Sequence, residues 1–174
     1  MKKLYPIAVV LVLILSTVLY SGMATSAAAK SSNIMEFGTM VSVTRPYTGA
    51  TNAIRGISGG GLPWVIRFAQ GELNTSGKLE VMVKGLVLDP NDPAVIAAGL
   101  AGKNPFTNFK AIVSCLSKDA GGNPITTNVS TDLFPASATG DSNIETTISL
   151  PSPCIAPIIF VTNPGGAWFA STGF

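Results

Sequence analysis

The chain has 174 residues, of which 47% are hydrophobic and only 11% carry a formal charge. It contains eleven Lys or Arg side chains, nine Asp or Glu side chains and no histidine. Without imidazole, the chain lacks the usual general base, the usual zinc ligand and the Ser-His-Asp triad, which excludes most hydrolase mechanisms.

The N-terminal segment has the pattern of a secretory signal peptide. Lys2 and Lys3 form a short positive head, and residues 4–29 are uncharged. The three alanines that end this run provide the small residues that signal peptidase accepts, so we predict cleavage between Ala29 and Lys30. The alternative is an uncleaved segment that anchors the protein at the cell surface, since the run is long enough to span a bilayer core.

Cleavage leaves residues 30–174, a length that suits one domain with a substantial core. Because Lys2 and Lys3 leave with the signal, the mature chain has no net charge. We therefore predict a secreted, extracellular protein that does not bind nucleic acid, and that contacts a membrane only if the N-terminal segment is retained. Residues 30–62 are expected to be partly loose, with a strand at 34–43 and then a glycine-rich loop.

Period-two alternation predicts strands in the next part of the chain. Residues 78–88 place Leu79, Val81 and Val83 at one parity, which is hard to reconcile with a helix. Residues 64–73 precede them, and the short polar turn between the two segments ends in glycine. We predict an antiparallel hairpin here.

One segment departs from the β pattern. Asp92 is a suitable cap, Pro93 suits the first helical position, residues 94–101 are mostly alanine and aliphatic, and Gly102 ends the run. These residues predict a short helix that crosses from one sheet to the other.

The remaining strands are predicted from runs rich in Val, Ile, Thr and Phe between turn residues. They cover residues 108–117, 125–133, 143–150, 155–162 and 167–172. Eight short strands at this spacing indicate an all-β domain, a two-sheet antiparallel sandwich of immunoglobulin-like architecture, with a small barrel as the alternative.

The only two cysteines are Cys115 and Cys154. In an exported chain they are expected to form a disulfide, since free buried thiols are the less favoured alternative in an oxidising compartment. Cys115 shares its parity with Phe109 and Val113, so we expect the bridge to join one sheet to the other.

Two acidic pairs are the candidates for a metal site. Asp89 lies close to Asp92, and Asp141 lies close to Glu145, so either pair offers oxygen ligands for calcium. Neither follows the spacing of a calcium-binding loop, and aspartate is also a common turn and cap residue. We predict no metal, no cofactor and no catalytic residue, and keep a carboxylate- or calcium-dependent hydrolase as the alternative function.

Aromatic residues provide a further hypothesis. Trp64 and Trp168, with Tyr47 and Phe174, are candidates for a stacking surface that binds a sugar or an extended peptide. The competing expectation, which we favour, places both tryptophans in or near the core.

Two stretches of the sequence resemble uncharacterised small secreted proteins of soil bacteria. They are residues 108–115 and residues 150–162, the latter running into residues 165–170, and the resemblance covers most of residues 62–174. It implies a small exported bacterial protein with paired cysteines, and it assigns no site residue because that group has no established activity. Together these observations predict a secreted or cell-surface, non-catalytic β-sandwich that interacts with an extracellular protein or glycan.

Overall fold

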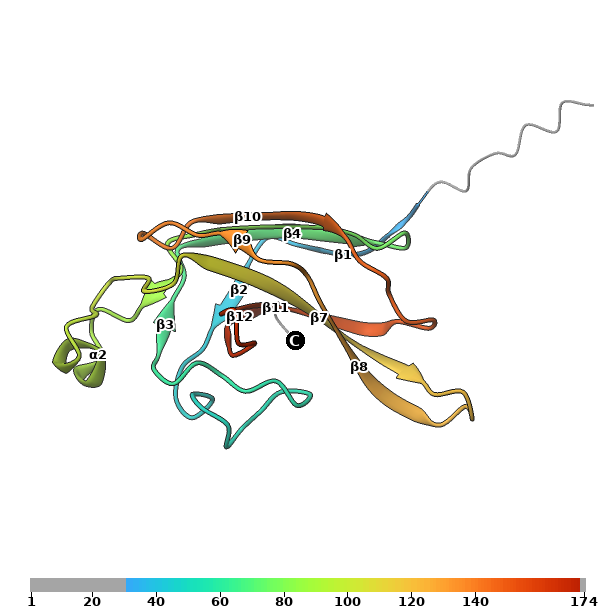
Figure 1. The fold of residues 1–174 in the computed structure, drawn as a ribbon, viewed down its shortest axis with the longest axis horizontal. Coiled ribbons are helices and arrows are strands. Elements are labelled where there is room, and N and C mark those ends of the chain that lie inside the picture. The colour runs from blue at the N-terminus through green and yellow to red at the C-terminus, as the bar shows by residue number, and fades with distance from the viewer. Residues whose placement is uncertain (1–30, 173–174) are drawn as a thin grey trace, which may run out of the picture. The chain divides into compact units, whose positions relative to one another are not determined.

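The computed structural model describes residues 31–172, which form antiparallel β-sheets and one short helix (Figure 1). The predicted signal peptide, its cleavage after Ala29, and Phe174 lie outside these residues. Within them, no helix has the length and hydropathy needed to cross a membrane.

Two sheets dominate the fold, and both are antiparallel. A four-stranded sheet has the order β1-β4-β5-β10, with β1 (Asn33–Phe37), β4 (Phe68–Asn74), β5 (Lys78–Lys84) and β10 (Ser142–Thr147). The six-stranded sheet has the order β2-β12-β11-β7-β8, with β9 on β7: β2 (Met40–Ser42), β7 (Asn108–Lys118), β8 (Pro124–Ser130), β9 (Phe134–Pro135), β11 (Ile155–Thr162) and β12 (Trp168–Thr172). A third sheet pairs β3 (Trp64–Val65) with β6 (Val87–Leu88).

One hydrophobic core takes side chains from both large sheets, which lie one above the other in Figure 1. The four-stranded sheet contributes Leu73, Leu79 and Val81, and the six-stranded sheet contributes Phe109 and Val113, all fully buried. The predicted alternation on β5 is confirmed, and so is the prediction of antiparallel sheets.

The β4–β5 hairpin forms at the predicted turn. The side-chain oxygen of Asn74 accepts hydrogen bonds from the backbone N–H groups of Ser76 and Lys78, each at 3.0 Å. Gly77 has φ +84°, and a Cβ there would collide with the carbonyl oxygen of Ile148. Only glycine fits this position.

We therefore expect Gly77→Ala to destabilise the protein by about 2 kcal/mol or more. Gly38→Ala is the matched control, because Gly38 has an ordinary φ and open space around its Cα, and we expect it to change stability by less than about 0.5 kcal/mol. Urea unfolding measures both, and similar losses in the two variants would contradict the turn geometry.

Three predicted strands are each divided in two by the structure. Residues 34–43 were expected to be one strand, but β1 ends at Phe37 and β2 lies in the other large sheet. Residues 78–88 divide at Gly85, with φ +66°, and residues 64–73 divide after Val65. A chain that leaves one sheet for another continues to alternate buried and exposed side chains, so the pattern does not reveal the break.

The helix is confirmed, and it is shorter than predicted. Helix α2 (Pro93–Ala97) begins after Asp92, whose carboxylate accepts from the backbone N–H of Ala94 and Val95. The helix stops before the predicted residue 101 because Gly99 adopts φ +69°. It lies between β5 and β7 in the chain, and so on the predicted crossover between the large sheets.

The glycine-rich loop after β2 makes specific contacts with the six-stranded sheet. Arg55 donates from Nη1 to the carbonyl oxygen of Ser114 on β7, and Asn128 on β8 donates to the carbonyl oxygen of Arg55. Ile57 is buried. The loop thus packs on the six-stranded sheet, on the side away from the four-stranded sheet (Figure 1). Because the loop covers one face of β7 and the four-stranded sheet covers the other, residues 111–115 of β7 are all buried.

The predicted disulfide between Cys115 and Cys154 is present. It does not join one sheet to the other, contrary to expectation. Cys154 directly precedes β11, and β11 pairs with β7 in the same sheet, where Ile155 lies opposite Leu116. The bridge therefore fixes two neighbouring strands at one end of the six-stranded sheet.

Replacing both cysteines by alanine is expected to lower the free energy of unfolding by about 3 to 4 kcal/mol, because the 39-residue separation closes a long loop in the unfolded chain. Chemical denaturation measures the loss. Reduced wild-type protein is the control, since it opens the bridge and keeps both cysteine side chains. A loss below about 1 kcal/mol in both samples would contradict this role.

Candidate functional site

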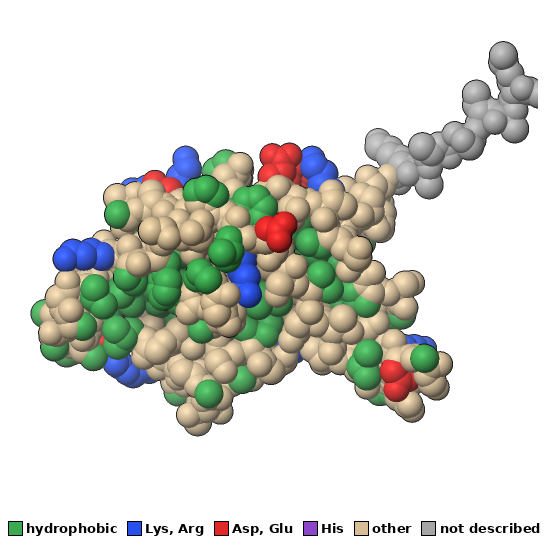
Figure 2. Space-filling view, viewed as in Figure 1, with side chains coloured by type: hydrophobic (Ala, Val, Ile, Leu, Met, Phe, Trp, Pro, Cys, Tyr) green, Lys and Arg blue, Asp and Glu red, His purple; other side chains and the backbone are tan. Residues whose placement is uncertain are grey.

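A small apolar pocket opens at one end of the core. It has a volume of about 240 Å³. Its walls are mainly apolar and come from Leu62, Trp64, Leu88, Leu100, Phe106 and Phe169. Hydrophobic side chains gather toward the end of the molecule that carries α2 on the face shown in Figure 2.

Aromatic rings from separate elements form the base of this pocket. Trp64 on β3 and Phe169 on β12 are stacked, with ring centroids 3.7 Å apart and planes inclined by 17°. Phe106 lies against Phe169 at 5.3 Å, and Phe109 on β7 meets Phe169 edge-on at 5.8 Å. Such contacts add to the stabilisation from burial and fix the orientation of the rings.

Backbone approaches the rings closely at Gly60. A Cβ at this position would lie 3.0 Å from Phe169 and 3.2 Å from Nε1 of Trp64. The Gly60 N–H donates to the carbonyl oxygen of Trp168 at 2.8 Å, which fixes this wall to β12. Glycine is therefore needed here for packing, since its φ is not in the left-handed region.

The two tryptophans occupy different places and do not form a joint surface. Trp64 is 2% exposed in the pocket base, and Trp168 is 3% exposed and packs against Phe160 at 6.0 Å. Both are core residues, as the favoured expectation states. Tyr47 is 46% exposed. Because both indoles are covered, neither offers a free face on which a ligand can stack.

The opposite wall of the pocket depends on the segment around α2. The Gly102 N–H donates to the carbonyl oxygen of Leu88, and the Leu100 N–H donates to that of Val95. These bonds fold the chain back after α2, so that Leu88 and Leu100 line the same pocket. Sequence reasoning did not find this site, because its residues come together only through tertiary contacts.

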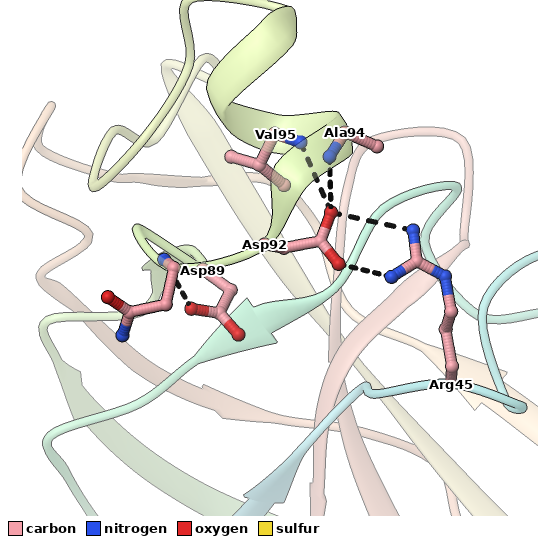
Figure 3. Close-up of polar contacts among 6 residues, drawn as sticks. Arg45, Asp89, Asp92, Ala94 and Val95 are labelled. Carbon is pink, nitrogen blue, oxygen red and sulfur yellow. Dashed lines mark hydrogen bonds and ion pairs between the residues drawn. The ribbon is translucent and has the colours of Figure 1, made fainter.

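Asp92 holds this segment to the loop after β2 (Figure 3). Its carboxylate accepts from the N–H of Ala94 at 3.0 Å and of Val95 at 3.2 Å, and forms an ion pair with Arg45. The hydrogen bond from Arg45 and the helix N–H groups hold the pKa of Asp92 below its ordinary value of 3.8. The carboxylate is thus matched by a cation and by the helix end.

Three of the predicted calcium ligands, Asp89, Asp92 and Asp141, each accept a hydrogen bond from a backbone N–H group. The Asp89 carboxylate accepts from the N–H of Asn91 (Figure 3), and Asp141 accepts from the N–H of Gly85 at 2.8 Å. Glu145 stands on the exposed face of β10. Among residues 31–172, no group of three or more acidic or cysteine side chains is arranged to hold a metal ion.

Asp92→Asn tests the charge of this carboxylate, because asparagine still caps a helix. The folded state lowers the pKa of Asp92. The ionised carboxylate therefore contributes fully to stability above about pH 4, and this contribution is lost as the pH falls through the pKa of Asp92 in the folded protein. We expect the variant to have a lower Tm than wild type at neutral pH, and the difference to shrink on acidification. Asp89→Asn is the control. A difference independent of pH would contradict the account.

A second feature lies on the outer face of the four-stranded sheet. Strand register places Glu36 opposite Glu72, Glu72 opposite Glu80, and Glu80 opposite Glu145. These are all the glutamates of the chain, and they form one row across four strands. Three of them line a shallow hollow of about 540 Å³.

Like charges directly opposite each other on a sheet are destabilising. Two glutamates of the row have polar partners that offset part of this repulsion. Lys78 forms an ion pair with Glu80, which raises the pKa of that lysine, and Asn33 donates to Glu72 at 3.1 Å. The sequence shows each glutamate at a polar parity, but the pairing register that aligns them is not visible in it.

Comparison of the chain with family models gives no match, and comparisons with curated proteins and with solved structures give none either. The resemblance to secreted proteins of soil bacteria therefore stays a prediction.

Proposed function

We propose that this protein is an exported, non-catalytic β-sandwich that binds an extracellular protein by receiving one large apolar side chain in the pocket above Trp64 and Phe169. The observation that carries the proposal is the size and lining of that pocket. Export is supported by the pattern of residues 1–29 and by the disulfide, which is typical of oxidising compartments.

The volume of the pocket favours a side chain over a whole small molecule. Pockets for drug-sized ligands have volumes of about 300 to 1,000 Å³. A dry apolar cavity of about 150 Å³ holds benzene. At about 240 Å³, this pocket suits a single Phe, Tyr, Leu or Met side chain.

The aromatic geometry favours a protein over a glycan. A sugar ring binds an aromatic side chain through an exposed ring face. Here Trp64 is stacked on Phe169 and is 2% exposed, so this contact occupies the ring face. An apolar side chain needs only contact with the pocket walls. Apolar anchors that fill a desolvated pocket supply much of the affinity in protein interfaces.

The test uses capped amino acids as probes and Trp64 as the reporter. Trp168→Phe leaves Trp64 as the only tryptophan of the chain. N-acetylphenylalaninamide and N-acetylleucinamide are expected to change its fluorescence saturably, with a Kd on the order of 1 to 10 mM. N-acetyllysinamide is expected to give no saturable change, because its ammonium group loses its hydration in an apolar pocket.

Leu100→Phe is the variant that fills the pocket, because it adds bulk at the pocket wall without adding a second tryptophan. Its matched control is Ile96→Phe on α2, a site that is 54% exposed and outside the pocket. We expect the first variant to weaken probe binding at least about tenfold and the second to leave it unchanged. Equal binding in both variants, or the same response to all three probes, would refute the proposal.

A further inference from the structure

The outer strands of the two large sheets differ in how they are protected against pairing with another chain. An unpaired edge strand exposes backbone N–H and C=O groups, and proteins protect it with charges or by keeping it short. Within residues 31–172, β1 carries Glu36, β10 carries Glu145, and β2 has only three residues. Strand β8 has seven residues, Pro124–Ser130, none of them is charged, and its only proline is at the first position, so residues 125–130 have neither a charge nor a proline.

The free groups of β8 are identified by its register with β7. The Thr131 N–H donates to the carbonyl oxygen of Ala111, and the pairing continues without a shift to Pro124 opposite Lys118. In an antiparallel ladder, alternate residues direct their N–H and C=O groups to opposite sides. Thr126, Asn128 and Ser130 therefore direct theirs away from β7.

The edge is accessible, because the β7–β8 hairpin projects from the body of the domain at the lower right of Figures 1 and 2. On β8 itself, Ile125 is 40% exposed.

We propose that β8 pairs antiparallel with β8 of a second copy of this chain, which joins two six-stranded sheets into one. A twofold axis at Asn128 sets Thr126 opposite the second copy's residue 130. The residues that meet are threonine, serine, asparagine and valine, so no like charges oppose each other across the new ladder. The acidic row opposes such pairing at β1 and β10, because a second copy would bring carboxylates to carboxylates.

This inference is independent of the apolar pocket, whose residues do not lie on β8. It is tested by sedimentation equilibrium of the purified protein over a wide concentration series. We expect a reversible monomer–dimer equilibrium. Thr126→Pro removes an outward N–H without breaking a bond to β7, and is expected to raise the dimer Kd at least about tenfold. Thr126→Ala keeps the N–H and is expected to dimerise like wild type.

Backbone hydrogen exchange locates the interface and does not depend on a variant folding well. We expect the amides of Thr126, Asn128 and Ser130 to exchange more slowly as the protein concentration rises, and the amides of β1 and β10 to be unaffected. A protein that stays monomeric throughout the series overturns the proposal. So does a dimer that forms equally well in Thr126→Pro, or one whose concentration-dependent protection lies on another strand.

Discussion

The contact of Trp64 with Phe169 holds together parts of the chain that are far apart in sequence. Trp64 lies on β3 of the two-stranded sheet, and Phe169 and Phe109 lie on β12 and β7 of the six-stranded sheet. Stacked and edge-on contacts fix these rings in one orientation. Trp64 and Phe169 form one wall of the pocket, and Leu100, in the segment after α2, forms another.

Charged side chains have two separate roles around this core. Asp92 and Asp141 hold backbone N–H groups at turns and at the helix end, and Arg45 connects Asp92 to the loop after β2. The glutamates instead form the row across the four-stranded sheet, where they are destabilising toward one another. Such a row is explained if it prevents pairing with other chains, since it protects both edges of that sheet.

Local signals in the sequence were sufficient for individual elements. The Asn74–Gly77 turn, the cap at Asp92 and the strand 155–162 were each predicted from a few neighbouring residues, and the disulfide from the presence of only two cysteines in an exported chain; the structure confirms all four. These features depend on backbone preferences or on the only possible cysteine pairing.

Features that depend on tertiary contacts were missed or misplaced. The break after Phe37 follows from two strands entering different sheets, and the disulfide lies within one sheet because β11 happens to pair with β7. The loop held by Arg55 covers the second face of β7, and no periodicity encodes which loop covers a sheet. The pocket and the glutamate row depend on strand register, which a single sequence does not determine.

Intermolecular nuclear Overhauser effects between N-acetylphenylalaninamide and the isotope-labelled protein show whether the pocket above Trp64 and Phe169 receives an apolar side chain. We expect contacts from the ring protons of the probe to Leu62, Leu100 and Phe106, which line the pocket. Contacts confined to exposed apolar residues such as Leu116 or Ile155, with none to the pocket, would contradict this expectation.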